Sequence, residues 1–362
     1  MKKYTFLDLA VVNAPYEKAM TEAVGRVITS GRYIGGSEVA AFEAGLSAAL
    51  GVDHVVAVAN GLDALRLIVR AYMELGRLKP GDEVVVPANS FVASALAVSD
   101  CGLEVRFADV DPDTYNLDWD KMPCGPKVKA VMPVHLYGRV CVVPEDIRQR
   151  YVVIEDSAQA IGARGACLMG HAAGMSFYPT KNIGALGDAG AVITPSEEVA
   201  AVVRSLGNYG TDRQYHNIYM GLNSRMDPVQ AAMLRVKLAA MDHENSIRRE
   251  RAGIYDAHIN NQLIELPKMP DDPETHVWHQ YVVRVADGRR DEFRRFMESR
   301  GVETAVHYPC PIHRQPCYAS RYSGLSLPVA ERLAEEVVSL PVSRGTSLDD
   351  ALEISAIVNE FE

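Results

Sequence analysis

The sequence has 362 residues, of which 48% are hydrophobic and 23% charged, and this composition excludes collagen-like chains, disordered tails and disulfide scaffolds. Its 47 acidic residues outnumber its 37 basic ones, and the formal net charge of −10 argues against a nucleic-acid partner. No apolar run reaches the roughly 18 residues that a membrane span needs, and the first residues contain no signal-peptide core, so we expect neither membrane insertion nor export.

Six cysteines are spread along the chain, at Cys101, Cys124, Cys141, Cys167, Cys310 and Cys317. None belongs to a CxxC pair, and the spacings do not suit zinc, so the sequence predicts no metal site. Free thiols in a chain of this size are typical of the cytoplasm, where we expect the protein to reside.

The first two thirds of the chain alternate between helix-like and strand-like segments. The spacing of apolar residues predicts helices over 16–30, 62–76 and 91–102. Short β-branched runs predict strands at 54–60, 83–87, 104–110, 129–134, 151–156, 174–179 and 190–194. Because such strands are apolar on both faces, the sequence predicts an α/β fold with a mostly parallel sheet covered by helices.

The pattern changes from Asp227 onwards. An amphipathic helical stretch over 228–259 leads into a loop at 267–276 that is rich in proline and aspartate. Beyond it we expect one strand at 279–285 and helices over 290–299, 328–338 and 349–361. We therefore predict a large domain over 1–245 and a smaller α+β domain over 246–362, with the N-terminal segment able to pack on the latter.

Polar residues follow the ends of several predicted strands, which is where open parallel sheets bind ligands. Asn60-Gly61-Leu62-Asp63 follows the first strand and opens a helix, so its backbone N–H groups are placed to approach a phosphate. A plain strand-to-helix turn requires the same residues, and both interpretations stay open at this point.

An acid and an amine follow two further strands. Asp156 ends one strand, and Lys181 lies 25 residues later, just beyond the next. Each has an ordinary alternative, since Asp156 is suited to cap a helix and Lys181 to lie on the surface. Together they suit a cofactor whose ring nitrogen meets an acid while its aldehyde meets an amine, as in pyridoxal phosphate (PLP) enzymes.

The segments NGLDAL, EDSAQ and SFYPTKNIGALGDAG, in this order and at these separations, resemble the DegT/DnrJ/EryC1/StrS family of sugar-nucleotide aminotransferases. The resemblance extends from FLDL at 6–9 and SGRYIGG at 30–36 to SLPVS at 339–343. It implies an aspartate aminotransferase-like fold, which is fold type I of PLP enzymes, and PLP as the cofactor.

The resemblance also implies roles for individual residues. Lys181 would form the Schiff base and then move a proton, while Asp156 would keep the ring nitrogen protonated. Gln159 would lie near the 3-hydroxyl of the cofactor, and Phe91 would stack on its ring. The cofactor phosphate would be held by Gly61, Leu62, Ser176 and Asn223.

Asn223 belongs to the segment 221–232, which resembles the family segment that reaches across a dimer interface. The resemblance therefore implies a homodimer in which each active site is built from two chains. Asn223 is also placed to cap the helix that Asp227 and Pro228 begin, and the two roles are compatible.

The substrate class comes from residues 305–318, AVHYPCPIHRQPCY, which resemble the branch of the family that acts on dTDP-linked 3-keto-6-deoxyhexoses. In that branch His307, Tyr308 and His313 would lie near the sugar or the diphosphate. A proline-rich loop can also need histidine for local hydrogen bonds alone. Three other residues are expected to approach substrate by the same resemblance: Tyr178, Tyr215 and His216.

The resulting prediction is an enzyme that transfers an amino group from L-glutamate to the C-3 keto carbon of a dTDP-linked sugar. One alternative is a C-4 aminotransferase of a dTDP- or UDP-4-keto sugar, and a lesser one is a non-catalytic regulator with this fold. A related branch that dehydrates sugars at C-3 carries histidine in place of the Schiff-base lysine, so Lys181 argues against it.

Overall fold

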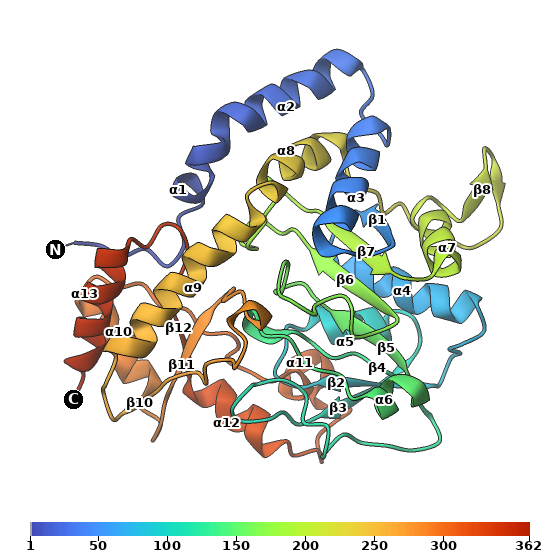
Figure 1. The fold of residues 1–362 in the computed structure, drawn as a ribbon. Helices are drawn as coiled ribbons and strands as arrows, with labels where there is room; N and C mark the ends of the chain where they lie inside the picture. Colours follow the sequence, from blue (N-terminus) through green and yellow to red (C-terminus); the bar gives the residue numbers. More distant parts are fainter. Residues whose placement is uncertain (1) are drawn as a thin grey trace.

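A seven-stranded sheet forms the centre of the computed structural model, which describes residues 2–362 (Figure 1). Its strands are β1 (His54–Val58), β2 (Glu83–Pro87), β3 (Glu104–Ala108), β4 (Val128–Val131), β5 (Val152–Asp156), β6 (Ala172–Ser176) and β7 (Gly190–Thr194). Their spatial order is β1-β7-β6-β5-β4-β2-β3. β7 runs antiparallel to β1 and β6, whereas the other neighbouring pairs are parallel, so the predicted mostly parallel sheet is confirmed.

Helices cover both faces of this sheet. They are α3 (Ser37–Leu50), α4 (Gly61–Glu74), α5 (Ala93–Ser99), α6 (Glu145–Arg150), α7 (Glu197–Gly207) and α8 (Pro228–Leu238). Val56 and Val58 of β1 pack in one core with α4, α5 and α7, and Val55 packs on the opposite face with α3 and α8. Because successive strand residues point to opposite, equally buried faces, the strands are apolar throughout.

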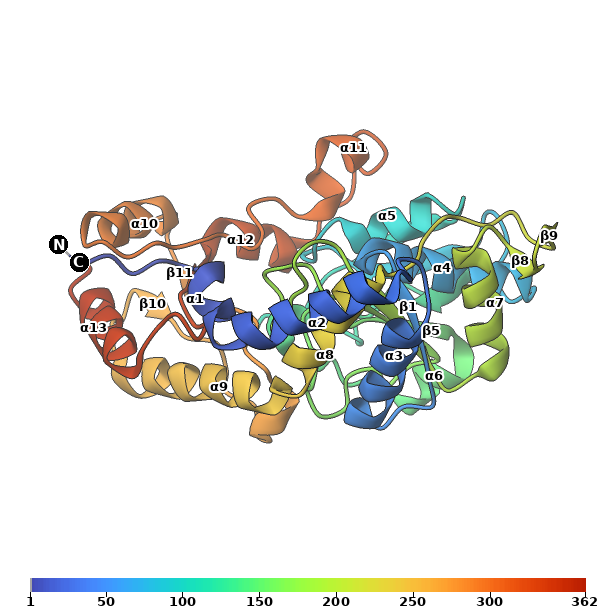
Figure 2. The same ribbon diagram turned by 90° about the horizontal axis from the view of Figure 1, so that it is seen from above.

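A smaller antiparallel sheet lies beyond α9 (Met241–His258), with the strand order β10-β11-β12. The elements of this part are β10 (Ile264–Glu265), β11 (Tyr281–Val285), α10 (Arg290–Ser299), α11 (Pro316–Ala319), α12 (Pro328–Glu336), β12 (Val337–Leu340) and α13 (Leu348–Asn359). In Figure 2 this sheet with α10 and α13 lies at one end of an elongated molecule. At the other end a hairpin, β8 (Thr211–Arg213) and β9 (His216–Asn217), projects beyond α7.

The N-terminal segment links these two parts. Tyr4 pairs with Val302 beside the small sheet, and α1 (Leu9–Asn13) and α2 (Glu17–Ser30) then lead towards the large one. α2 packs on α8 through a small apolar cluster (Figure 1). The domain boundary predicted at residue 245 falls inside the continuous helix α9, and the division into domains stays a prediction. Within residues 2–362, none of the helices is both long and apolar enough to cross a bilayer.

The structure differs from the predicted elements at several points. α3 was not predicted, because it buries only Phe42 and Leu46 in a run rich in alanine and its apolar periodicity is therefore weak. The stretch predicted over 228–259 is two helices, because α8 packs on the large sheet whereas α9 packs on the small one. The helix predicted over 328–338 ends at Glu336, since Val337 and Val338 pair with β11.

Candidate active site

Lys181 lies in a tight loop that follows β6, and we call residues 177–186 the lysine loop. A backbone hydrogen bond of 2.8 Å, from Ala185 N to the oxygen of Phe177, joins the two ends of this loop. A side chain at Gly184 would place its Cβ 2.2 Å from the oxygen of Pro179, so only glycine fits this turn. Burial lowers the pKa of Lys181 to about 8, although the charge of Asp156 opposes that shift.

Asp156 ends β5 as a buried carboxylate with two protein donors. Ser94 of α5 donates its hydroxyl to Oδ2 at 2.7 Å, and the backbone N–H of Ala158 lies 3.2 Å from Oδ1. In the described residues no helix directly follows β5, so the second contact closes a turn and is not the helix cap that was the alternative interpretation of Asp156, and it leaves the carboxylate available to a further donor. An N–H on a cationic ring is the kind of donor that such a buried carboxylate would hold.

Two aromatic side chains, Tyr308 and Phe91, lie near this carboxylate. Gln159 accepts the backbone N–H of Tyr137 at 2.6 Å through Oε1 and donates from Nε2 to the Tyr308 hydroxyl at 3.1 Å. The Tyr308 ring lies 5.7 Å from that of Phe91, centroid to centroid. Phe91 is nonetheless 55% exposed, so it offers a free aromatic face on which a flat ring could stack.

Three of the four predicted phosphate residues, Gly61, Leu62 and Ser176, meet at the first turn of α4. Asn60 caps this helix by accepting the N–H of Asp63 at 2.8 Å. A Cβ on Gly61 would lie only 2.6 Å from the Cβ of Ser176, so the helix N-terminus and the serine hydroxyl are immediate neighbours. Leu62 is the next residue of the same turn. Free N–H groups at a helix start together with a hydroxyl form a donor set that fits a phosphate.

The two histidines of the loop at 305–318 lie in different surroundings. His307 shares a 2.8 Å hydrogen bond with Ser339 Oγ, and burial together with the charge of Lys181 lowers its pKa to about 4. His307 is therefore a neutral neighbour of the lysine. His313 has no exposed surface, and its Nε2 lies 2.9 Å from Glu331 of α12. Within one chain His313 therefore holds α12, and its contact with substrate stays a prediction.

Four further predicted residues lie on the surface of the chain: Tyr178, Tyr215, His216 and Asn223. Tyr178 precedes Lys181 in the lysine loop, but Tyr215 and His216 lie in the β8–β9 hairpin, which projects away from the sheet (Figure 1). Asn223 pairs through its backbone with Asn208, near the base of that hairpin. Within one chain, Tyr215 and His216 therefore project away from the sheet. Asn223, in contrast, precedes Ser224, whose Oγ accepts the backbone N–H of Ala59 at 3.3 Å, just before the first turn of α4.

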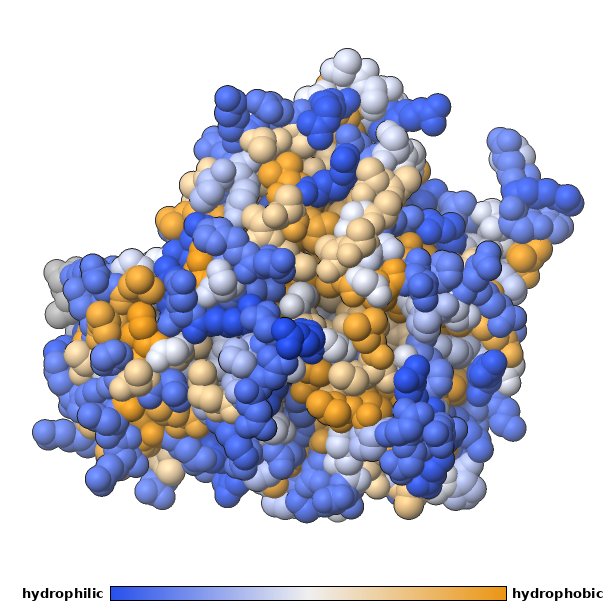
Figure 3. Space-filling model, viewed as in Figure 1, coloured by the Kyte–Doolittle hydropathy of each residue, from blue (hydrophilic) through white to orange (hydrophobic). Residues whose placement is uncertain are grey.

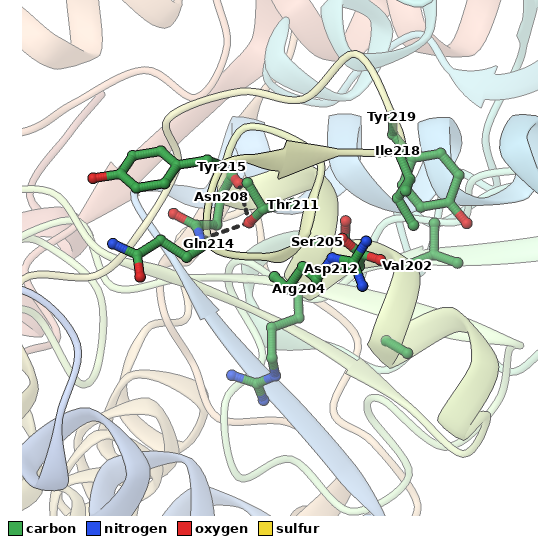
Figure 4. A pocket seen from close by; sticks show the side chains of 12 residues that line it. Val202, Arg204, Ser205, Asn208, Thr211, Asp212, Gln214, Tyr215, Ile218 and Tyr219 are labelled. Atoms are coloured by element: carbon green, nitrogen blue, oxygen red, sulfur yellow. Dashed lines mark hydrogen bonds between the residues drawn. The ribbon is translucent and has the colours of Figure 1, made fainter.

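A cleft of about 820 Å³ lies between α7 and the hairpin. Figure 4 shows Tyr215 and Gln214 on one side of it and Ile218 and Tyr219 on the other. Tyr215 is 93% exposed. The hairpin thus exposes an aromatic side chain that packs little against its own chain.

Sequence reasoning missed a buried polar network around the lysine loop. Asn182 donates from Nδ2 to Asn245 Oδ1 at 2.9 Å and to the oxygen of Val277 at 3.0 Å, and it accepts from His279 Nδ1 at 3.1 Å. Burial and the charge of Lys181 keep the pKa of His279 well below its usual range. These three partners lie 63, 95 and 97 residues from Asn182, too far apart for any motif to link them.

A buried hydrogen-bonded pair next to Asp156 was also not predicted from the sequence. The neighbouring Glu155 lies 2.7 Å from His135 Nε2 and accepts the backbone N–H groups of Cys167 and Gly170, all of them buried. Because His135 Nδ1 accepts the N–H of Cys141 at 3.0 Å, Nε2 is the protonated nitrogen. The only sequence signal was the acid itself, one residue before Asp156.

A lysine and a carboxylate that converge beyond the carboxyl ends of a mostly parallel sheet, beside a phosphate-binding helix start, define a PLP-dependent enzyme. The chain belongs to the DegT/DnrJ/EryC1/StrS aminotransferase family, whose profile matches residues 16–359.

Individual relatives agree with this assignment. The chain is 43% identical to dTDP-3-amino-3,6-dideoxy-alpha-D-galactopyranose transaminase from Aneurinibacillus thermoaerophilus, over 98% of this chain and 99% of that one. It is 40% identical to dTDP-3-amino-3,4,6-trideoxy-alpha-D-glucose transaminase from Streptomyces venezuelae, over 98% and 95%. The crystal structure of NtdA from Bacillus subtilis, with the cofactor PMP bound, superimposes with a TM-score of 0.92 at 31% identity and covers all of this chain and 86% of that one.

The family, the fold class and the PLP-dependent aminotransferase class expected from the sequence are thereby confirmed. PMP is the amino form of the predicted cofactor, and the protein groups around Lys181 suit that cofactor. The roles of the individual site residues remain predictions.

Proposed function

We propose that the protein transfers an amino group from L-glutamate to C-3 of a dTDP-linked 3-keto-6-deoxyhexose, giving a dTDP-3-amino-3,6-dideoxyhexose. The observation that carries this substrate class is the 43% identity, over nearly the whole of both chains, to a transaminase of a dTDP-3-amino-3,6-dideoxy sugar. The retained Lys181 and Asp156 favour catalysis over the regulatory alternative.

The residues that would hold the cofactor are those whose geometry suits its three parts. Gly61, Leu62 and Ser176 would receive the phosphate, and Phe91 would stack on the ring. Asp156 would accept the ring N–H. When bound, PLP supplies an electron sink for the carbanion left by proton loss and carries the amino group between the two substrates.

Lys181 would move the proton in both half-reactions. A lysine whose pKa lies near 8 can donate and accept a proton close to neutral pH, which an exposed lysine cannot do efficiently. Neutral His307 and Tyr308 would contact the sugar, with hydrogen bonds that add no charge near the lysine.

A homodimer would complete the site. Asn223 makes no side-chain hydrogen bond within residues 2–362, and the nearby Met220 is 87% exposed. Figure 3 shows hydrophobic side chains gathered over the face where α2 and α8 meet. A second copy that covers this face would bring Asn223 to the phosphate and Tyr215 and His216 to the substrate of the first. We also infer a cytoplasmic location, since all six cysteines are free.

The proposed function is tested by separating the two half-reactions. The protein is charged with L-glutamate, desalted, and then mixed with either the 3-keto or the 4-keto dTDP-sugar. We expect the visible band of bound PLP to fall with glutamate and to return with the 3-keto sugar, with one amino sugar formed per active site. A return with the 4-keto sugar alone would establish the C-4 alternative, and failure to take up PLP at all would support the regulatory one.

A further inference from the structure

A lysine outside the predicted site is buried against the lysine loop. Lys237, in the last turn of α8, is only 3% exposed. Its Nζ donates to the backbone oxygen of Gly184 at 2.7 Å and to Asn13 Oδ1 at 2.9 Å. Neither partner carries a charge, so a buried ammonium group is held here by neutral oxygens alone.

Burying a lysine at this position costs more free energy than filling the same space with an apolar side chain. Burial lowers the pKa of Lys237 to about 8, with Glu244 opposing and Arg248 reinforcing the shift. A methionine has nearly the same length and would fill the space without removing a charge from water. What lysine adds is a strong donor to the Gly184 carbonyl.

A second side chain of α8 holds the same loop. Gln230 accepts the N–H of Leu186 at 3.0 Å and donates to the oxygen of Leu186, also at 3.0 Å. Gln230 and Lys237 are seven residues apart and thus lie on one face of the helix. Together with Asn245 of α9, which holds Asn182, they fix the lysine loop at three points after Lys181.

The other partner of Lys237 belongs to the N-terminal segment. Asn13 ends α1, and the nearby Tyr16 donates to Glu244, which also receives Arg344 Nε at 2.7 Å. Arg344 follows the last strand of the small sheet. Lys237 therefore joins the backbone of the lysine loop to the segment that runs between the two sheets.

We propose that Lys237 is a positioning residue for Lys181, fixing the lysine loop through Gly184 and tying it to Asn13 of the N-terminal segment. It touches neither substrate nor cofactor and acts through the backbone. This inference rests on the proposed role of Lys181 as the residue that binds PLP, but not on the identity of the sugar.

The test compares Lys237→Met with Arg235→Met, which removes a cation from the exposed side of the same helix. For Lys237→Met we expect kcat to fall about tenfold, the loss of one charge-assisted hydrogen bond, with KM for both substrates within about threefold. We also expect faster amide exchange over 178–190, with or without cofactor, and a shifted pH midpoint of the PLP absorption band. Arg235→Met should change none of these quantities.

Two further variants separate positioning from stability. Lys237→Gln keeps N–H donors without the charge and should recover part of the lost kcat, whereas Asn13→Ala should slow turnover by a few-fold and speed exchange at 184–186. If Lys237→Met does not fold, Asn13→Ala alone decides. A folded Lys237→Met, or an Asn13→Ala, with wild-type kcat and exchange overturns the inference. Wild-type protein that binds no PLP would instead contradict the proposed function.

Discussion

The Lys181 side and the Asn223 side of the site are held in opposite ways. Lys181 lies in a loop fixed by side chains of α8 and α9, and Asp156 has two protein donors of its own. Asn223 and Tyr215 lie on the surface, on or beside a projecting hairpin. The proposed homodimer accounts for this contrast: in it the cofactor ring is held within one chain, whereas the phosphate and substrate contacts are completed by a second.

The largest effect is expected for Lys181 itself, on the side of the site that is fixed within one chain. Lys181→Ala removes the amine proposed to bind the cofactor and to move the proton, so kcat should fall by about 10⁴-fold. The visible band of bound PLP should be lost while the far-UV circular dichroism stays that of the wild type. Turnover at the wild-type rate would refute the role of Lys181.

Asp156→Asn should have the next largest effect. The amide keeps the shape and can still accept from Ser94, but it carries no negative charge to stabilise a cationic ring, so kcat should fall about 10²- to 10³-fold. A suitable control is Asp109→Asn, another buried acid, which caps α12 through Val329 and Ala330. The control should lower the melting temperature without altering the cofactor spectrum, and equal rate losses in both variants would count against Asp156.

On the exposed side, Asn223→Ala should weaken cofactor binding more than turnover. Losing one hydrogen bond to a charged phosphate should raise the Kd for PLP about 10- to 100-fold, while kcat at saturating PLP changes little. Spectroscopic titration with PLP measures this, with Asn359→Ala at the end of α13 as a remote control. An unchanged Kd would remove Asn223 from the phosphate site.

The smallest effect is expected at Ser94, which acts only through Asp156. Ser94→Ala deletes one of the two donors to that carboxylate, so kcat should fall about fivefold, the worth of one ordinary hydrogen bond. Ser99→Ala, at the end of the same helix, should leave kcat unchanged. A loss in Ser99→Ala as large as in Ser94→Ala would mean that α5, and not the bond to Asp156, matters.

Much of the Lys181 side was predictable because its residues lie at strand ends within short motifs. Asp156, Gln159 and Lys181 follow recognisable strands, and the parallel sheet brings those ends together. The residues that hold them were not predictable in this way. Lys237 and Asn245 come from helices far along the chain, and only packing decides which helical residue meets the lysine loop.

His313 shows what sequence alone does not reveal about a residue's surroundings. In sequence it stands in a proline-rich loop beside His307, and nothing local distinguishes the two. The difference lies in Glu331, 18 residues later, whose position on α12 gives His313 a buried partner. The break between α8 and α9 was hidden for a similar reason, since the two helices pack on different sheets.

The central claim, one site built from two chains, is tested most directly by mixing Lys181→Ala with Asn223→Ala after reversible dissociation. PLP is kept at a level that saturates the wild type but not Asn223→Ala. In a hybrid dimer, one site combines the intact Lys181 of one chain with the intact Asn223 of the other. Random pairing makes roughly half of the dimers hybrid, so the mixture should regain about one quarter of wild-type activity. Activity no higher than the average of the two variants measured separately would contradict the shared site.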